Sequence, residues 1–565
     1  MLSYASGVSD VPLLGQTIGE NFDATVARFP DNEALVVRHQ NVRYTYRQLS
    51  DAVNECARAL LALGIKKGER LGIWAPNCAE WVITQYATSK IGVILVNINP
   101  AYRTSELDYV VRQSELCGLI LAPRLKSSDY CKMLEELIPE LAGQAAHART
   151  IQSARFPVLR HLVVIEDAAR PGFMNWRDLL ALAPQVTAEH LGDMQRLQQF
   201  DDPINIQYTS GTTGFPKGAT LTHHNILNNG YFVGERMRFT SRDRLCIPVP
   251  LYHCFGMVLG NLACTTHGAT MIYPGETFEP LATLETVQAE KCTALHGVPS
   301  MFIAELNHPE LGRFDFSSLR TGLMAGSPCP IEVMKEVTTR MHMTEVEIAY
   351  GMTETSPVSF QTEADSPLEK RVGTVGRAMP FVECKIVDPV SGMVAPRGIP
   401  GELCTRGYSI MLGYWNNREA TAQAIDPARW MHTGDLATMD ADGYVNIVGR
   451  IKDMIIRGGE NIYPREIEEF LYTHPAVADV QVIGVPSRKY GEEVMAWVKV
   501  KPGAQATPDE LRAFCQGKIS HYKVPRYIKL VDGFPMTVTG KIQKYIMRQQ
   551  SIEDLGLQGE IQATA

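Results

Sequence analysis

The chain has 565 residues and a mass of 62.7 kDa, too long for one ordinary hydrophobic core, so we expect two or more domains. Its 62 acidic and 54 basic residues give a formal net charge of −8, which argues against a broad nucleic-acid surface. The twelve cysteines include no CxxC pair and no Cys/His cluster at zinc spacing. The sequence therefore favours free thiols, no structural metal and a reducing, cytoplasmic compartment.

The N-terminal residues match neither a secretory signal nor an Arg-rich transit peptide. No run of about 18 apolar residues occurs, and the most apolar stretch, Leu245–Pro274, is interrupted by prolines, histidines and an asparagine. We therefore expect no membrane span, although this stretch could line an apolar pocket.

The first third of the chain alternates short apolar runs with amphipathic ones. The pattern predicts strands at 70–76, 93–98 and 117–123 and helices at 79–92 and 105–115. This alternation is typical of parallel βαβ units, so we expect an α/β fold. Its large N-terminal domain should contain mixed or parallel sheets flanked by helices.

The pattern of apolar and polar residues changes after Gly449. The sequence predicts a helix at 462–475, strands at 477–485 and 493–500, and a further helix at 508–519. These elements suffice for a small α+β domain at the C-terminal end of the chain.

The most informative segment, Tyr208–Gly218, reads YTSGTTGFPKG. Its small and hydroxylated residues would let backbone N–H groups approach a polyphosphate, and Lys217 adds a positive charge. It is not a Walker A loop, because Pro216 stands where that motif needs glycine. The predicted phosphate-contacting residues are Thr209, Ser210, Gly211, Thr212, Thr213, Gly214 and Lys217.

This segment resembles the phosphate-binding signature of the adenylate-forming superfamily, which includes acyl-CoA synthetases, firefly luciferase and adenylation domains of nonribosomal peptide synthetases. Further motifs follow in the family's order: YGMTETS (350–356), TGD (433–435), GRIKD (449–453) with RGGEN (457–461), and TGK (539–541). The resemblance runs from about Phe22 to Arg548. Around YGMTETSPVSF and VGTVGRAMP, the chain is similar to the medium-chain branch that includes acyl-CoA synthetase family member two.

The resemblance implies a two-step reaction with ATP, Mg²⁺ and coenzyme A. A carboxylate and ATP would give an acyl-adenylate and pyrophosphate, and transfer to CoA would then give acyl-CoA and AMP. A medium-chain fatty acid is the expected substrate. Peripheral membrane contact would suit a fatty substrate, and the oligomeric state stays open, a homodimer included.

The resemblance also assigns the nucleotide contacts. Tyr350 is expected to stack on adenine, and Asp435 and Arg450 to bind the ribose. Glu354 and Thr212 match residues that hold Mg²⁺ against the phosphates. The remaining expected contacts are Gly326, Ser327, Pro328, Gly351, Met352 and Thr353.

Lys541 is the expected catalytic residue, with Thr212 and Glu354. Attack of a carboxylate on the α-phosphate builds negative charge, which a lysine from a mobile domain can stabilise. No general base is needed, because the substrate carboxylate is already ionised. Lys452 matches the family's hinge, which divides the chain into an adenylation domain (1–451) and a mobile domain (452–565).

The resemblance further implies an acyl pocket and a thiol tunnel. His253 would act as a gate between the phosphates and the acyl chain, although a lone histidine is more often a packed residue. Gly458, Gly459 and Glu460 would line the tunnel for pantetheine once the small domain has rotated. The expected acyl-lining residues, each explained nearly as well by core packing, are Met257, Val298, Pro299, Met301, Leu323, Met324 and Met352.

Several alternatives stay open. The chain could act on aryl, branched or terpenoid acids, or load a stand-alone acyl carrier protein. Luciferase-like oxidation is disfavoured, because no motif indicates oxygen chemistry. A non-catalytic acyl-nucleotide-binding protein is disfavoured by the presence of Thr212, Glu354, Asp435, Arg450 and Lys541.

Overall fold

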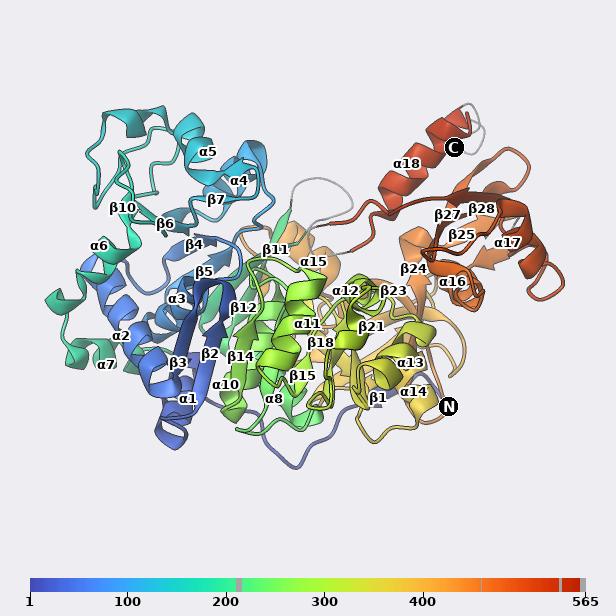
Figure 1. The fold of residues 1–565 in the computed structure, drawn as a ribbon, viewed down its shortest axis with the longest axis horizontal. Coiled ribbons are helices and arrows are strands. Elements are labelled where there is room, and N and C mark those ends of the chain that lie inside the picture. Colours follow the sequence, from blue (N-terminus) through green and yellow to red (C-terminus); the bar gives the residue numbers. More distant parts are fainter. Residues whose placement is uncertain (210–215, 459, 538–540, 559–565) are drawn as a thin grey trace.

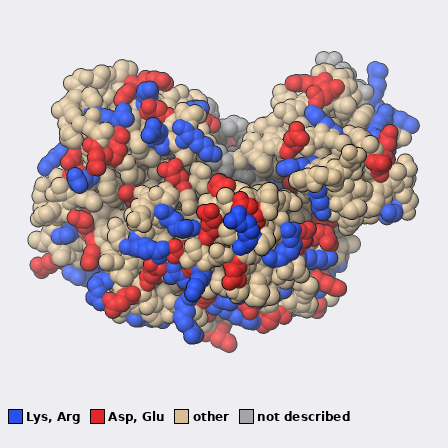
Figure 2. Space-filling view, viewed as in Figure 1, with Lys and Arg blue, Asp and Glu red and all other residues tan. Residues whose placement is uncertain are grey.

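A computed structural model describes residues 1–209, 216–458, 460–537 and 541–558. The fold is mixed α/β, as expected, with a large body that contains three extended sheets and a smaller C-terminal body with a sheet of its own (Figure 1). Figure 2 shows a hollow between the two bodies, and acidic and basic side chains are interspersed over the face it presents.

The first sheet has the order β10-β9-β6-β4-β5-β11-β12-β22. Its strands pair in parallel from β10 to β11, and β12 and β22 then add antiparallel. The strands are β4 (Arg70–Trp74), β5 (Ile94–Asn97), β6 (Leu116–Leu121), β9 (His161–Val164), β10 (Met174–Asn175), β11 (Pro203–Thr209), β12 (Lys217–Thr222) and β22 (Gly413–Tyr414).

The second sheet has the order β19-β18-β17-β16-β15-β13-β14-β2-β3, with a parallel centre and antiparallel edges. Its strands are β2 (Glu33–Val37), β3 (Val42–Thr45), β13 (Arg244–Cys246), β14 (Thr270–Tyr273), β15 (Ala294–Leu295), β16 (Thr321–Ala325), β17 (Glu345–Gly351), β18 (Val358–Gln361) and β19 (Arg377–Ala378). Together the two sheets hold β11 and β17, at whose ends the YTSGTTGFPKG and YGMTETS motifs begin.

Helices cover and separate these sheets. Every residue of α3 except Glu80 is buried, which identifies it as an interior helix. The helices of the large body are α1 (Ile18–Arg28), α2 (Tyr46–Ala62), α3 (Ala79–Ile91), α4 (Thr104–Gln113), α5 (Tyr130–Leu137), α6 (Trp176–Leu180), α7 (Ala188–Arg196), α8 (His223–Arg236), α9 (Cys254–Gly256), α10 (Ala263–His267), α11 (Pro280–Ala289), α12 (Pro299–Leu306), α13 (Ile331–Arg340), α14 (Leu368–Gly373) and α15 (Arg418–Ala424).

The third sheet, β1-β20-β21-β23-β24, is antiparallel throughout. It consists of β1 (Tyr4–Ser6), β20 (Val382–Val387), β21 (Gly401–Gly407), β23 (Met431–Met439) and β24 (Val445–Arg450). Strand β24 leads directly into the small body, so this sheet carries the connection between the two bodies.

The small body is built on β26-β25-β28-β27, with β29 parallel to β28. Its elements are β25 (Ile455–Arg457), β26 (Glu460–Ile462), α16 (Pro464–Tyr472), β27 (Val477–Ser487), β28 (Gly491–Val500), α17 (Pro508–Cys515), β29 (Tyr527–Leu530) and α18 (Lys544–Asp554). Helix α16 contacts the large body through two polar contacts. Glu469 accepts a hydrogen bond from the Ile331 N–H at 3.4 Å, and Arg465 donates to the Ile447 carbonyl at 3.1 Å.

The elements predicted from the sequence are confirmed, with boundaries that differ by a few residues. The predicted strand at 70–76 is β4 and the predicted helix at 79–92 is α3. Within the described ranges, every helix is too short or too polar to cross a lipid bilayer. The apolar stretch Leu245–Pro274 instead folds into β13, β14 and the short helices between them, including a π-helix at Met257–Leu262.

Alanine substitutions at two glycines can test how closely β16 approaches β15. Gly322, in β16, has φ +144°, and a Cβ there would lie 1.9 Å from the Leu295 carbonyl oxygen. Gly64 also has a positive φ, +88°, but a Cβ there would meet open space. We expect Gly64→Ala to lower the free energy of unfolding by about 1 kcal/mol through backbone strain. Gly322→Ala should lower it by at least about 3 kcal/mol, because a backbone clash is added.

Denaturant unfolding of the two variants measures this difference. Similar losses for both would contradict the close approach of β16 to β15.

Candidate active site

The predicted phosphate loop joins two antiparallel strands. Thr209, the last residue of β11, pairs with Lys217, the first residue of β12. The Lys217 ammonium lies 5.2 Å from the centre of the Tyr414 ring. The intervening predicted residues Ser210, Gly211, Thr212, Thr213 and Gly214 lie outside the described residues.

Glu354 lies beside the ends of this hairpin. It belongs to a short 3-10 turn, Thr353–Thr355, that follows β17, and its side chain is buried. Thr209 Oγ1 donates to Glu354 Oε1 at 3.2 Å, and the Tyr414 hydroxyl donates to the same oxygen at 2.8 Å. Among the described residues, the side-chain bonds to this carboxylate all end on Oε1. The hairpin and the YGMTETS motif are therefore joined at one carboxylate.

Tyr414 is a site residue that the sequence did not indicate. It lies in β22, whose pairing with β12 places Tyr414 opposite Ala219. Burial is the main reason that the pKa of Tyr414 is raised, and the neighbouring Glu354 raises it further, so Tyr414 stays a neutral donor. No local pattern marks this tyrosine; only the pairing of distant strands does.

Asp435 is held from two sides. The Tyr350 hydroxyl donates to Asp435 Oδ2 at 2.6 Å, and Arg450 Nε donates to Asp435 Oδ1 at 3.1 Å. Asp435 and Arg450 face each other across β23 and β24, whereas Tyr350 comes from β17 in a different sheet. Burial raises the pKa of Asp435, and its two donors oppose that shift. The structure thus brings together three residues that the sequence assigned separately to adenine and ribose.

A close backbone approach explains the glycine after Tyr350. A Cβ on Gly351 would lie 1.7 Å from the Pro357 carbonyl oxygen. The turn that carries Met352 and Thr353 folds back at this point, because the Met352 N–H donates to the same carbonyl at 3.0 Å. Gly351 therefore fixes the direction in which the motif leaves the sheet.

Lys541 reaches this group from the small body, and Figure 1 shows the segment before α18 running toward the end of β11. Its backbone is tied to Thr537, whose N–H donates to the Lys541 carbonyl at 2.8 Å. Burial lowers the pKa of Lys541 and Arg450 lowers it further, whereas Glu354 and Asp435 raise it. The Lys541 ammonium group is therefore close enough to both carboxylates for their charges to shift its pKa.

His253 is close enough to Lys541 for the lysine's charge to act on its pKa. It caps the short helix α9, where its Nδ1 accepts a hydrogen bond from the Phe255 N–H at 3.2 Å. Burial lowers the pKa of His253 to about 3, and the positive charge of Lys541 contributes to the shift. The imidazole is therefore neutral at physiological pH.

The predicted acyl-lining residues are only partly brought together. Met257, Val298, Met301 and Leu323 belong to one buried apolar cluster, to which Met352 is packed. Met324 belongs to a different cluster, because neighbouring residues of β16 point to opposite faces of the sheet. Pro299 begins α12 at the edge of the first group. The structure therefore separates Met324 from the proposed lining.

The loop predicted to line the adenine pocket directly follows β16. Gly326 has φ +91°, and a Cβ there would lie 3.2 Å from Val298 Cγ1. Gly326 and Pro328 are exposed and Ser327 is half-buried. The loop thus connects the strand that carries Leu323 to the start of α13, where Glu469 of the small body is bound.

The predicted hinge and tunnel residues lie in the small body or at its entrance. Lys452 belongs to a 3-10 turn, Ile451–Asp453, between β24 and β25. Gly458 has φ +60°, and its N–H donates to the Tyr490 carbonyl at 2.7 Å within the small body. Glu460 is exposed in β26, and Gly459 lies outside the described residues. In this conformation Lys541 of the small body is close enough to Glu354 and Asp435 for the charges to interact.

Comparisons with known proteins agree with this arrangement. A family model described as AMP-binding enzyme matches residues 22–415, and one described as AMP-binding enzyme C-terminal domain matches residues 466–541. The chain is 51% identical to "Putative acyl-CoA synthetase YngI" of Bacillus subtilis over 96% of its length and 99% of that protein. It is 46% identical to "Medium-chain acyl-CoA ligase ACSF2, mitochondrial" of Danio rerio, covering 98% and 91% of the two chains.

Solved structures show the same fold over the whole chain. The crystal structure of the anthranilate CoA ligase AuaEII in complex with anthranoyl-AMP superposes with a TM-score of 0.82 at 26% identity, covering 96% of this chain and 98% of that one. ATP-bound MatB from Rhodopseudomonas palustris gives a TM-score of 0.81 at 26% identity, covering 95% and 99%.

The position of Lys541 beside His253 can be tested by titration. NMR of the histidine-labelled protein should give His253 a pKa of about 3. Lys541→Met should raise that pKa, because removing a nearby positive charge makes the imidazolium easier to form. The pKa of His253 in this variant should still lie below that of an ordinary histidine, because burial is the larger cause of the shift.

His296 is the matched control. Burial lowers its pKa to about 4, and Lys541 does not contribute to that shift, so the substitution should leave it unchanged. An unchanged pKa of His253 in Lys541→Met would place Lys541 away from it in solution.

Proposed function

This chain belongs to the AMP-binding enzyme family, and we propose that it activates medium-chain fatty acids where Lys541 faces Glu354 and Asp435. It is an AMP-forming acid–thiol ligase, which uses ATP to join a fatty acid to CoA. The observation that carries the proposal is the position of Lys541. The charges of both carboxylates of the large body raise the pKa of this lysine from the small body.

In the first step, a carboxylate oxygen of the acid attacks the α-phosphorus of ATP. The bond from the α-phosphorus to the oxygen bridging the β-phosphate breaks, and pyrophosphate leaves with the electron pair. Negative charge builds on the α-phosphate oxygens, and the Lys541 ammonium is placed to stabilise it. The acid arrives ionised, so no protein group has to remove a proton.

Asp435 positions the nucleotide for this attack. Its carboxylate accepts from Tyr350 and Arg450, and a ribose hydroxyl can add a further donor to either oxygen. The Tyr350 ring is proposed to stack on adenine, because its hydroxyl already fixes the ring beside Asp435. Lys217 and Thr209 close the phosphate end of the site, with the loop between them as the proposed phosphate cradle.

Glu354 fits the proposed Mg²⁺. Both described hydrogen-bond partners of its carboxylate are hydroxyls, those of Thr209 and Tyr414, and Mg²⁺ prefers oxygen ligands. Thr212, the second proposed ligand, lies outside the described residues. When bound, the ion would offset the charge of the phosphates, while Glu354 keeps its hydrogen bonds through Oε1.

In the second step, the sulfur of CoA attacks the acyl carbonyl carbon. The bond from that carbon to the phosphate oxygen breaks, AMP leaves with the electron pair, and the thiol proton passes to solvent. We propose that the small body, residues 452–565, rotates about Lys452 between the steps, so that Gly458, Gly459 and Glu460 replace Lys541. The two polar contacts of α16 with the large body are exchangeable with water, which suits such a rotation.

The acyl chain is proposed to lie against Met257, Val298, Met301 and Leu323. These side chains belong to one buried apolar cluster, and two methionines among them can adjust to different chain lengths. The neutral imidazole of His253 then separates the charged site from the chain.

The twelve cysteines are buried free thiols, which supports the proposed reducing compartment.

Lys541→Ala tests the division into two steps. Pyrophosphate release should fall at least about a hundredfold, because one electrostatic contact to the transition state is lost. Conversion of supplied acyl-adenylate and CoA to thioester should continue at close to the wild-type rate. Lys523→Ala, which removes an ion pair with Glu466 within the small body, should leave both rates unchanged. Equal loss of both steps in Lys541→Ala would contradict the division.

An acid panel tests the substrate. Acetate, octanoate, palmitate and benzoate are supplied with ATP, with and without CoA, and pyrophosphate and thioester are measured. Each methylene that enters the apolar cluster adds about 0.8 kcal/mol, roughly a fourfold gain in kcat/KM, until the pocket is full. We expect the maximum at octanoate, with thioester formed only when CoA is present. Preference for benzoate would favour an aryl-acid ligase instead.

A further inference from the structure

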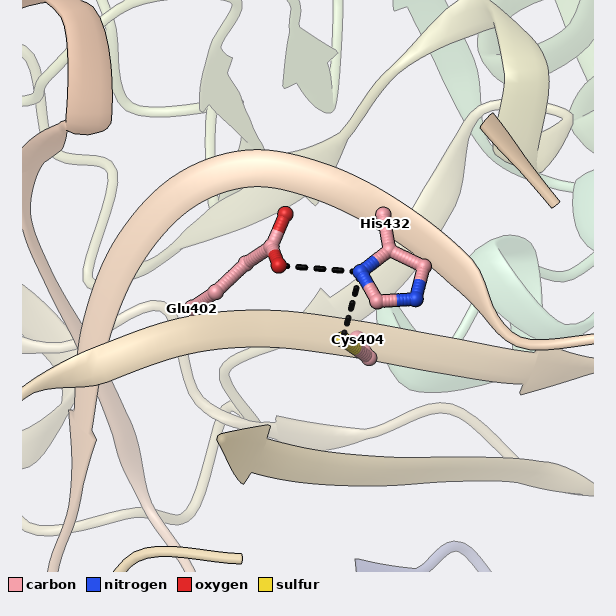
Figure 3. A group of neighbouring side chains, drawn as sticks. All are labelled: Glu402, Cys404 and His432. Atoms are coloured by element: carbon pink, nitrogen blue, oxygen red, sulfur yellow. Dashed lines mark hydrogen bonds and ion pairs between the residues drawn. The ribbon is translucent and has the colours of Figure 1, made fainter. Parts of the chain in front are cut away.

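A second group of reactive side chains lies on the sheet that carries Asp435 (Figure 3). Glu402 and Cys404 are two residues apart on β21, so their side chains share a face, and His432 on β23 is the cross-strand partner of Cys404. The sequence predicted no Cys/His cluster at zinc spacing, because about thirty residues separate the strands. The pairing of β21 with β23 brings them together.

The three ligand atoms lie close together, and the nitrogen–sulfur distance matches that of a zinc site. His432 Nδ1 lies 2.9 Å from Glu402 Oε2 and 3.6 Å from Cys404 Sγ, and the three ligand atoms lie within 4.8 Å of one another. Tetrahedral zinc binds sulfur at roughly 2.3 Å and imidazole nitrogen at roughly 2.0 Å, which separates those two atoms by about 3.6 Å. Thiolate, imidazole and carboxylate together are a donor set that zinc prefers over magnesium.

The surroundings support the same ion. The other nitrogen of His432, Nε2, lies 4.0 Å from Asp426 Oδ2, so this carboxylate adds negative charge beside the cluster. Glu402 and Asp426 place negative charge near the Cys404 sulfur, and Lys385 offsets part of it. Cys404 itself is buried, whereas 36% of the His432 side chain is exposed, so an ion can enter from the His432 side.

The cluster is coupled to the turn that carries Asp435. Glu402 Oε1 accepts a hydrogen bond from the Gly434 N–H at 3.2 Å, and Thr433 Oγ1 donates to the Leu403 carbonyl at 2.7 Å. One carboxylate therefore holds His432 with one oxygen and the Thr433–Gly434–Asp435 turn with the other. A zinc ion bound by both side chains would hold the Glu402 oxygen and the His432 nitrogen about 3.3 Å apart, so it would move the carboxylate that holds the turn.

We propose that Glu402, Cys404 and His432 bind Zn²⁺ and that the bound ion weakens nucleotide binding at Asp435. The Cys404 thiol releases its proton to solvent as the sulfur–zinc bond forms, and a water molecule completes the tetrahedron. Zinc affinity therefore rises with pH, because the thiol must lose its proton. Zinc binding does not depend on the proposed function, whereas its effect on nucleotide binding rests on the proposed ribose site at Asp435.

Zinc binding is measured by calorimetry on chelator-treated enzyme without nucleotide. Wild type should bind one Zn²⁺, and Cys404→Ala and His432→Gln should bind it at least about tenfold more weakly. Cys384→Ala is the matched control, because Cys384 is equally buried on the adjacent strand β20 and belongs to no such group among the described residues. With Co²⁺, wild type and Cys384→Ala should show a thiolate-to-cobalt charge-transfer band that Cys404→Ala lacks.

Equal zinc affinity in wild type and Cys404→Ala would overturn the site, as would the absence of zinc binding by wild type. Cys404→Ser guards against misfolding, since it keeps the size of the side chain and should still lose the cobalt band. Each variant must retain the wild-type unfolding transition for the comparison to count.

Coupling is measured with adenosine, which binds the ribose site but has no phosphate to chelate zinc. Zn²⁺ should weaken adenosine binding roughly fivefold or more in wild type and leave it unchanged in Cys404→Ala, and by linkage adenosine should weaken Zn²⁺ binding equally. Unchanged adenosine affinity in zinc-loaded wild type would overturn the coupling. This readout needs no turnover, so it is separate from a failure of the acid panel.

Discussion

The carboxylate of Asp435 is the point on which the site depends, because three separate parts of the molecule converge on it. Tyr350 approaches from the nine-stranded sheet, Arg450 from the last strand of the antiparallel sheet, and Lys541 from the small body. Burial alone would favour the neutral acid, so the ionised form is maintained by these donors and cations. Removing one partner would leave a poorly compensated buried charge, which costs several kcal/mol.

Glu354 plays the corresponding part at the phosphate end. Its Oε1 joins the end of β11 to β22 through Thr209 and Tyr414, so the phosphate hairpin and the YGMTETS turn cannot move independently. Two carboxylates, Glu354 and Asp435, thus face two cations, Arg450 and Lys541, in a partly buried space. Lys541 comes from the small body. The position of that body therefore depends on the total charge in the site, including the charge of a bound ligand.

The turn that carries Asp435 owes its shape to irregular strand pairing. The registers of β21 with β23 and of β23 with β24 both shift near this turn, and Gly434 adopts φ +71°. The shift frees the Gly434 N–H from the ladder, and Glu402 binds it from the adjacent strand. The position of Asp435 and the cluster of Glu402, Cys404 and His432 are therefore both consequences of this irregular pairing.

Much of the fold and of the site could be predicted from the sequence, because local pattern decides those parts. Alternating apolar runs predicted β4, α3 and the small body, since side-chain periodicity follows directly from backbone geometry. The motifs likewise identified Glu354, Asp435 and Lys541 by resemblance. What the sequence determined by itself is therefore the set of elements, the family and the residues with chemistry to perform.

Tertiary structure alone decided which of these residues meet. Tyr414 hydrogen-bonds to Glu354 because β22 pairs with β12. Met324 lies apart from the proposed acyl-lining residues, because its position in β16 points it to the opposite face of the sheet. Cys404 meets His432 only through the register of two strands far apart in the chain. Such contacts depend on strand order and register, which are set by packing of the whole molecule and leave no local signature in the sequence.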